Sequence, residues 1–260
     1  MEKFGPAIVV SILITSTLAA GAGSQKIAPS LYRIDGKPVP SSCLVDLAGM
    51  GEPRAVNLAH CGDSSVKPKS LPTGVVGYED PQGGYFYYRY LGKVDGLDIL
   101  YGESSGGGSG QFTSLVGIAR DGQTLTQKRV YGGGDRCNGG VSDASIANGR
   151  LSFDQAITPY DLIALADPGT KLEAYKDLEA SASSCIGDSH MIHDNQHWTG
   201  VTLTEKSLTD QKGWTEQYRY QACFNVLYRE TVAQGHAKLD RNGVKIFAAN
   251  FTKRCVHPKG

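Results

Sequence analysis

The sequence lacks an excess of charge of either sign, with 26 lysine and arginine residues against 26 aspartate and glutamate residues. Proteins that bind nucleic acid or an anionic membrane surface usually carry a basic excess, because contacts with phosphate supply much of the affinity. The balance therefore gives no reason to expect either partner. After residue 22 the chain also lacks an apolar run long enough to cross a bilayer as a helix. No integral membrane segment is expected in the mature chain.

Cysteine is scarce, and no two of the six cysteines form a Cys-x-x-Cys pair. This spacing argues against a redox dithiol and against the common zinc-binding patterns. An even number of widely spaced cysteines favours structural disulfides in an oxidising compartment, and a catalytic thiol would leave one partner unpaired. Because closing short loops costs less entropy, we expect the sequential pairing Cys43–Cys61, Cys137–Cys185 and Cys223–Cys255.

The N-terminus has the pattern of a cleavable signal peptide. A short charged start is followed by an apolar run from Ala7 to Ala20, relieved only by serine and threonine, and then by small residues up to Ala22. We expect cleavage after Ala22, with residues 23–260 as the mature chain; a retained N-terminal anchor is the alternative. No cysteine follows the run directly, so a lipid anchor is not expected. The predicted location is the periplasm or the extracellular space.

Turn dipeptides such as Asp95-Gly96, Asp121-Gly122 and Asn148-Gly149 punctuate the mature chain. Gly and Asn tolerate the positive φ angles of tight hairpin turns, so these pairs between β-prone runs predict hairpins. We expect hairpins over residues 85–101, 112–131 and 236–251. The predicted fold is mainly β (α+β), an antiparallel meander or sandwich-like arrangement with a few short helices, stabilised by disulfides.

Helical patterns are confined to the middle of the chain. Thr158-Pro159 precedes apolar residues at helical spacing up to Ala166, and Leu172–Ala180 is a second short candidate. We expect one β-rich domain over residues 23–260. The alternative is a division into two lobes near residues 135–180.

Gly102-Glu103-Ser104-Ser105-Gly106 matches the Gly-x-Ser-x-Gly motif of serine esterases and lipases, with Ser104 as the candidate nucleophile. That motif requires a turn from a strand into a helix. Here glycines and then a β-prone run follow, and no His-Gly-Gly motif lies upstream. A loop rich in serine and glycine is the competing interpretation.

Three histidines, His190, His193 and His197, lie within eight residues. On a helix they would share one face, where Asp188 or Asp194 could add an oxygen ligand, and the group could then bind a divalent metal. The neighbouring glycine, aspartate and asparagine residues disfavour a helix, and the zinc-protease motif His-Glu-x-x-His is absent. A solvated loop beside Cys185 is the alternative.

The segment from Tyr85 to Leu91 is rich in aromatic residues. Strand alternation places Tyr85, Tyr87 and Arg89 on one face and Phe86, Tyr88 and Tyr90 on the other. Tyrosine and arginine are common anchors of protein interfaces, so the first set is a candidate binding face. The rings could instead cover the core at the rim of a strand.

These patterns favour an extracytoplasmic protein that binds another protein, such as an enzyme or a toxin, and acts without catalysis as an inhibitor or immunity-type protein. Hairpins held by disulfides are rigid platforms for recognition loops. The alternative is a secreted hydrolase, acting through Ser104 or through a metal at the cluster from His190 to His197. No cofactor is expected other than that metal.

Overall fold

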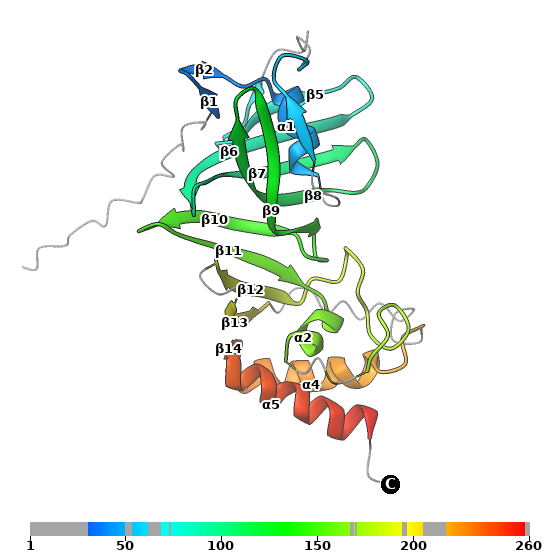
Figure 1. Cartoon of the computed structure of the whole chain (residues 1–260). Coiled ribbons are helices and arrows are strands. Elements are labelled where there is room, and N and C mark those ends of the chain that lie inside the picture. Colours follow the sequence, from blue (N-terminus) through cyan, green and yellow to red (C-terminus); the bar gives the residue numbers. More distant parts are fainter. Residues whose placement is uncertain are drawn as a thin grey trace, which may run out of the picture.

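The computed structural model describes residues 31–49, 54–61, 69–72, 74–166, 169, 171–193, 197–204 and 217–257. The predicted signal peptide, residues 1–22, lies outside the described residues. Two antiparallel sheets dominate the fold, and the second sheet lies between the first and a group of helices (Figure 1). Across the described ranges, no helix is both long and apolar enough to cross a membrane.

The first sheet has seven strands in the order β3-β9-β8-β7-β6-β5-β4. Its strands are β3 (Ala55–Asn57), β4 (Lys69–Ser70), β5 (Val76–Glu79), β6 (Gly84–Val94), β7 (Leu97–Gly106), β8 (Phe112–Asp121) and β9 (Thr124–Asp135). The predicted hairpins over residues 85–101 and 112–131 are confirmed. At the first of these turns Asp95 and Gly96 both have positive φ, 50° and 78°, as a type I′ turn requires.

A small hairpin and one helix cover a face of the first sheet. These elements are β1 (Arg33–Ile34), β2 (Lys37–Pro38) and α1 (Ser41–Ala48). Leu44 and Leu47 of α1 are fully buried against Phe86 and Tyr88 of β6. The predicted alternation along β6 is therefore confirmed on this side.

The second sheet has five strands in the order β10-β11-β12-β13-β14. They are β10 (Val141–Ala147), β11 (Arg150–Ile157), β12 (Gly187–Ile192), β13 (His197–Leu203) and β14 (Lys238–Asp240). The first sheet ends at Asp135 and the second begins at Val141, within the range 135–180 that the sequence marks for a division. The two sheets nevertheless share a buried cluster that includes Tyr87, Leu115 and Phe153.

One face of the second sheet packs against two different neighbours. Leu151, Phe153 and Ile157 alternate along β11 and so point the same way. Leu151 and Phe153 pack against the first sheet, whereas Ile157 packs with the helices. Register places Leu203 of β13 on this same face, opposite Gly187, which pairs with Ile157. One apolar face therefore joins both halves of the molecule.

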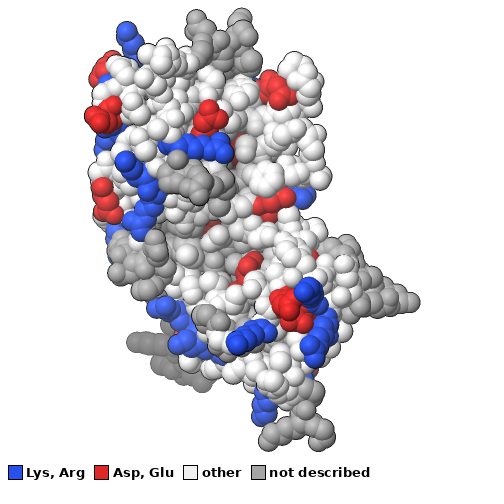
Figure 2. All heavy atoms as spheres, turned by 45° about the vertical axis from the view of Figure 1, so that its right-hand side comes forward, with Lys and Arg blue, Asp and Glu red and all other residues white. Residues whose placement is uncertain are grey.

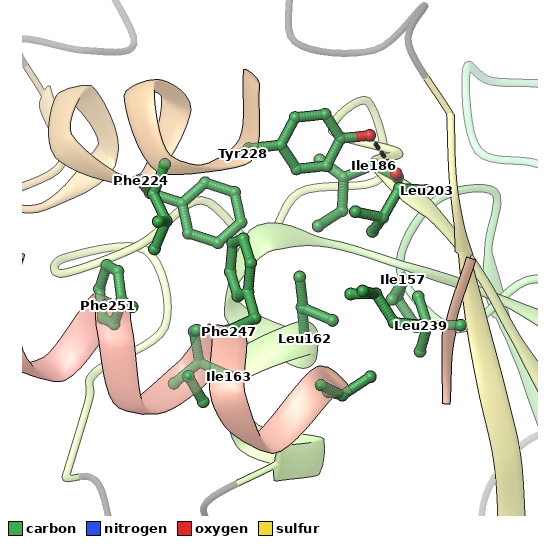
Figure 3. Close-up of a cluster of buried hydrophobic side chains, with 14 of the residues drawn as sticks. Ile157, Leu162, Ile163, Ile186, Leu203, Phe224, Tyr228, Leu239, Phe247 and Phe251 are labelled. Atoms are coloured by element: carbon green, nitrogen blue, oxygen red, sulfur yellow. Dashed lines mark hydrogen bonds between the residues drawn. The ribbon is translucent and has the colours of Figure 1, made fainter. Parts of the chain in front are cut away.

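Helices α2 (Pro159–Ala166), α4 (Gln221–Ala233) and α5 (Arg241–Phe251), with a π-helical turn over Thr252–Val256, cover the rest of this face. Phe224 of α4 lies at the centre, with its ring centroid 5.5 Å from that of Phe247 and 5.9 Å from that of Phe251 (Figure 3). The buried Tyr228 hydroxyl donates a hydrogen bond of 2.7 Å to the Ile186 carbonyl. This bond ties α4 to the second sheet.

The helix predicted after Thr158-Pro159 is confirmed as α2. Two reciprocal hydrogen bonds cap the start of this helix. The Asp161 carboxylate accepts from the Thr158 backbone N–H at 2.9 Å, and the Thr158 hydroxyl accepts from the Asp161 backbone N–H at 3.2 Å. The helix predicted over Leu172–Ala180 is wrong. That segment is a turn closed by a bridge between Ala174 and Leu178, and Tyr175 has a φ of 63°, which no α-helix accommodates.

The hairpin predicted over residues 236–251 is also wrong. Asp240 ends β14 and its carboxylate accepts a 2.7 Å hydrogen bond from the Gly243 N–H, which caps α5. The pair Asn242-Gly243 thus lies in the first turn of a helix. Helices consequently lie near both ends of the described chain as well as in its middle.

The three predicted disulfides are confirmed. The Cα–Cα distances are 5.4 Å for Cys43–Cys61, 4.4 Å for Cys137–Cys185 and 5.7 Å for Cys223–Cys255. The first holds α1, the last joins α4 to the C-terminal turn, and Cys137–Cys185 joins the segment after β9 to the residue that precedes Ile186 and β12. Each bridge therefore fixes elements that pack on a sheet.

Replacing Phe224 with alanine should lower the free energy of unfolding by about 3–5 kcal/mol, because it opens a cavity where three aromatic rings meet. Urea denaturation measures this loss. Val226→Ala on the same helix is the control: Val226 is 47% exposed, so its change should stay within about 0.5 kcal/mol. Equal losses in the two variants would show that α4 packs differently.

Candidate functional site

Ser104 lies within β7, where it pairs with Phe86 of β6 and Phe112 of β8. The chain continues through a glycine-rich loop into β8, so the serine is in an antiparallel sheet and not on a turn from a strand into a helix. Among the described residues, no hydrogen bond joins Ser104 to a histidine. The geometry required of a nucleophile elbow is therefore not formed around Ser104.

The histidines lie on a hairpin and not on a helix, so the predicted helical spacing does not apply. His190 is in β12, with its Nδ1 2.5 Å from an Asp154 carboxylate oxygen. His193 follows β12 and its Nε2 is 2.9 Å from an Asp95 carboxylate oxygen. His197 begins β13, and its side chain lies outside the described part of the structure. Within the part of the chain that the structure describes, no group of three metal-ligating side chains forms.

The face formed by Tyr85, Tyr87 and Arg89 points toward the second sheet. Tyr87 is only 3% exposed, and its hydroxyl donates to Glu79 at 2.5 Å. Burial, followed by this carboxylate, raises the pKa of the Tyr87 hydroxyl. The Arg89 guanidinium donates to the Ala144 carbonyl at 3.2 Å and lies over the Tyr101 ring. Tyr87 and Arg89 thus help to join the sheets, and only Tyr85 also reaches a surface cavity.

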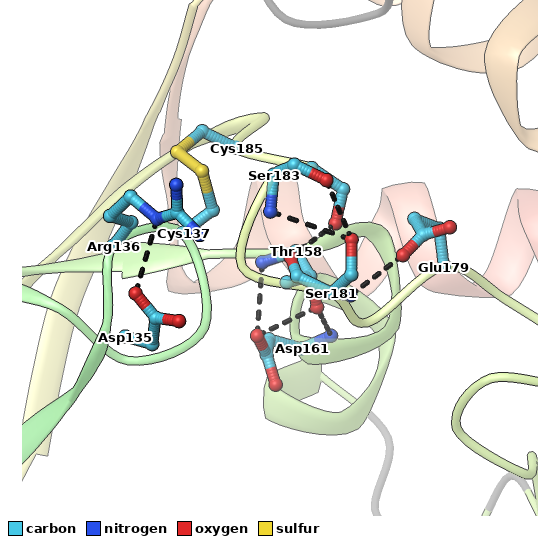
Figure 4. The surroundings of a disulfide bond; sticks show 10 residues. Asp135, Arg136, Cys137, Thr158, Asp161, Glu179, Ser181, Ser183 and Cys185 are labelled. Atoms are coloured by element: carbon cyan, nitrogen blue, oxygen red, sulfur yellow. Dashed lines mark hydrogen bonds and ion pairs between the residues drawn. A yellow bond between two sulfur atoms is a disulfide. The ribbon is translucent and has the colours of Figure 1, made fainter. Parts of the chain in front are cut away.

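Strand β12 is tied to the first sheet at both ends. Cys185, close to its start, is bonded to Cys137 after β9 (Figure 4). His193, directly after its end, contacts Asp95 in the turn between β6 and β7, and its ring meets that of Tyr131 edge-on, with centroids 4.6 Å apart. These two ties hold the second sheet at a fixed place against the first.

A surface cavity of about 350 Å³ opens where the two sheets meet, beside the Cys137–Cys185 disulfide. Tyr85, Glu103 and Phe112 line it from the first sheet, and Ala156 and Asp188 from the second. Phe112, which belongs to this lining, has 46% of its surface exposed. Ala156 also lines a second cavity, formed with Gln155 and α2, so the two hollows lie next to each other.

The rim of the first cavity is held by backbone bonds and by an ion pair. The Arg136 N–H donates to the Gln111 carbonyl at 3.1 Å, and the Asp135 carboxylate accepts from the Gln111 N–H at 3.0 Å. The Arg136 guanidinium in turn pairs with Asp135 at 3.1 Å (Figure 4). The glycine-rich loop before β8 is thereby fixed to the turn that carries Cys137.

Asp188 is the cavity residue with the most unusual environment. It is partly buried, and it forms no ion pair with any other residue that the structure describes. Burial raises the pKa of its carboxyl group, and the neighbouring Asp154 and Asp143 raise it further. Arg136 is paired with Asp135, and within the described ranges neither Glu103 nor Asp188 of the lining forms an ion pair.

Figure 2 draws one face of the molecule with its charged side chains coloured. Basic and acidic side chains are interspersed there (Figure 2). This agrees with the balanced composition.

Comparisons with protein-family models, curated proteins and solved structures found no match to this chain. Geometry is therefore the basis for proposing a function.

From the sequence, Asp188 was predicted only as a possible metal ligand beside the histidines. Phe112 and Arg136 were not among the predicted site residues. The signal for Asp188 was its place in a strand that also carries buried residues. The signal for Phe112 was an aromatic residue directly after a glycine-rich loop. Neither signal identifies a cavity, because the walls come from segments far apart in the chain.

Asp188→Asn should raise stability at neutral pH by less than about 1 kcal/mol, since the carboxylate remains partly in water. A raised pKa means that the folded state holds the proton more tightly than the unfolded state. The free-energy cost of the charge is thus complete above the folded pKa, and it declines as the pH falls toward the ordinary pKa of an aspartate. Urea denaturation at neutral and acidic pH should show a gain that narrows in acid.

Asp46→Asn is the control for that measurement, because Asp46 is exposed on α1 and its replacement changes the net charge equally. It should leave stability nearly unchanged. A loss of stability in Asp188→Asn at neutral pH would show that the carboxylate has a stabilising partner.

Proposed function

We propose that the chain is an extracytoplasmic binding protein that acts without catalysis, as an inhibitor or immunity-type protein, on a protein partner. We call the partner-binding region the junction surface, formed by Tyr85, Glu103, Phe112, Arg136 and Asp188. One observation carries the proposal: Phe112, which is 46% exposed, and the partly buried Asp188, which has no ion-pair partner among the described residues, both line a cavity built from the two sheets.

This combination is typical of sites that bind proteins. Binding energy is usually concentrated in a few anchors that fit pockets, with aromatic residues and arginine prominent among them. A bound partner would bury the exposed part of Phe112, and a basic group of that partner would neutralise the partly buried carboxylate; both contacts favour binding.

The rigidity of the junction surface supports the same proposal. The Cys137–Cys185 disulfide lies beside the cavity, and the bonds of Gln111 hold the loop before Phe112. A surface fixed before binding loses less conformational entropy when a partner docks.

The location is proposed from the same bridges. Three disulfides persist in oxidising compartments such as the periplasm or the extracellular space. The signal peptide expected from the sequence would direct the chain there.

The hydrolase alternative has no specific support from the described residues. Ser104 lies within a sheet, and His190 and His193 contact different carboxylates on different elements. We therefore propose a single function.

Affinity capture from the native extracytoplasmic fraction, followed by mass spectrometry, tests this function. The intact oxidised protein should recover a defined protein, and Phe112→Ala should weaken the measured affinity by at least about tenfold, as expected for an aromatic anchor.

Val226→Ala is the matched control, because Val226 and Phe112 are almost equally exposed, at 47% and 46%, and Val226 lies on α4. It should retain the partner. Recovery of no specific protein would refute the binding function, and equal recovery by both variants would place the interface elsewhere.

A further inference from the structure

The balanced composition conceals an uneven distribution of charge along the chain. Residues 201–260 hold ten lysine and arginine residues against five aspartate and glutamate residues, whereas residues 151–200 hold two against eight. The first count includes residues 205–216, which lie outside the described part, so the basic excess does not depend on their placement. Because α4, β14 and α5 all belong to this stretch, the C-terminal end of the fold is basic although the whole chain is neutral.

The carboxylates of the described C-terminal part are already engaged. Glu230 of α4 pairs with Arg254, and the Asp240 carboxylate accepts the hydrogen bond that caps α5. Lys238 on β14 and Lys245 on α5 are both exposed. Among the described residues, neither lysine forms an ion pair. Their charges are therefore open to an anionic partner.

A surface cavity of about 530 Å³ lies between the end of α4, β14 and α5. Its lining includes Leu239 and Phe247, which belong to the core, and Ile246, which is 54% exposed. Lys238 lines the same cavity. An apolar group that entered it would gain by burial against these side chains. The lining shares no residue with the cavity of the junction surface, so the two surfaces are separate.

The exposed face of α5 places further cations close to this cavity. Residues four apart lie in one row along a helix. Arg241 and Lys245 form one exposed row, while Ile246 and Asn250, which follow Lys245 on the same face, line the cavity. The Arg241 guanidinium also lies over the Trp198 ring, 5.5 Å from its centroid. Positive charge and exposed apolar surface thus occur together on one helix.

The shape of this region favours a protein segment over a lipid surface. Apolar groups that contact a membrane protrude into it. Here Leu239 and Phe247 are only 8% and 3% exposed, so the apolar wall is recessed and an incoming side chain has to reach it. A protein segment can supply that side chain together with carboxylates beside it.

We propose that this region, which we call the basic surface and define by Lys238, Lys245 and Ile246, docks an acidic segment of another protein. An apolar side chain of the segment enters the cavity, and neighbouring carboxylates pair with Lys238 and Lys245. Exposed ion pairs contribute little individually, so the apolar contact supplies most of the affinity and the lysines select an acidic partner. The proposal is independent of the function assigned to the junction surface.

The test titrates the intact oxidised protein with short capped peptides and follows its backbone amide chemical shifts. Glu-Glu-Gly-Leu-Gly-Glu-Glu should shift the amides around the cavity, and its affinity should fall as salt rises, because exposed ion pairs are screened. The same peptide with glycine in place of leucine should bind at least about tenfold more weakly, because it buries no apolar side chain. A peptide with lysine in place of every glutamate should not bind.

Variants connect this binding to the named residues. Ile246→Ala should weaken the binding of the leucine peptide at least about threefold, because apolar contact is lost. Val226→Ala is the control, since Val226 is an exposed aliphatic residue on α4 outside the cavity lining. Lys238→Gln should weaken binding about threefold, whereas Lys37→Gln, which removes an equal charge from exposed β2, should leave it unchanged. The unfolding midpoint of each variant confirms that it is folded.

Three results would overturn the proposal. The first is equal binding of the leucine and glycine peptides, or unchanged binding by both Ile246→Ala and Lys238→Gln. The second is binding to phosphatidylglycerol vesicles without any binding to the leucine peptide, since the region would then be a lipid-facing surface. The third is loss of the peptide in Phe112→Ala, which would place its site at the junction surface. Capture of a partner through Phe112 is measured separately, so the function proposed for the junction surface stands or fails by itself.

Discussion

The register between β11 and β12 is the constraint on which the two halves depend. Phe153 pairs with Met191 and Ile157 with Gly187, so Phe153, which packs against the first sheet, and Ile157, which packs against the helices, lie on the same face of the second sheet. A shift of one residue would turn that face to solvent and separate the first sheet from the helices at once. The same register places Asp188 on the opposite face, beside the cavity. Core and site therefore share one determinant.

Local signals in the sequence predicted local structure well. Asp95-Gly96 and Asp121-Gly122 gave correct hairpins because the backbone conformation of a tight turn depends on its own residues. Asn242-Gly243 gave a wrong hairpin, because the Asp240 side chain caps a helix at this place instead. The apolar face of α5 then packs in the core and stabilises that helix. At Tyr175 the pattern of apolar residues indicated a helix, whereas the bridge between Ala174 and Leu178 closes a turn.

The site was harder to predict, because its parts are distant in sequence. Alternation along β6 correctly grouped Tyr85, Tyr87 and Arg89, yet it could not reveal that the second sheet covers that face. Phe112, the exposed phenylalanine of the cavity lining, is on β8, which β7 separates from β6. That Phe112 and Asp188 line the same cavity depends on how the two sheets pack. A pattern with a period of two identifies a face, whereas the partner of that face is set by tertiary structure.

The two ties on β12 have a consequence for how the cavity behaves over time. A strand joined to its neighbour at one end only could swing and widen the gap between the sheets. With Cys185 near one end and His193 at the other, the mouth keeps a constant width. A partner that docks there would meet a surface already in place, so we expect differences in affinity between partners to lie mainly in the rate of dissociation.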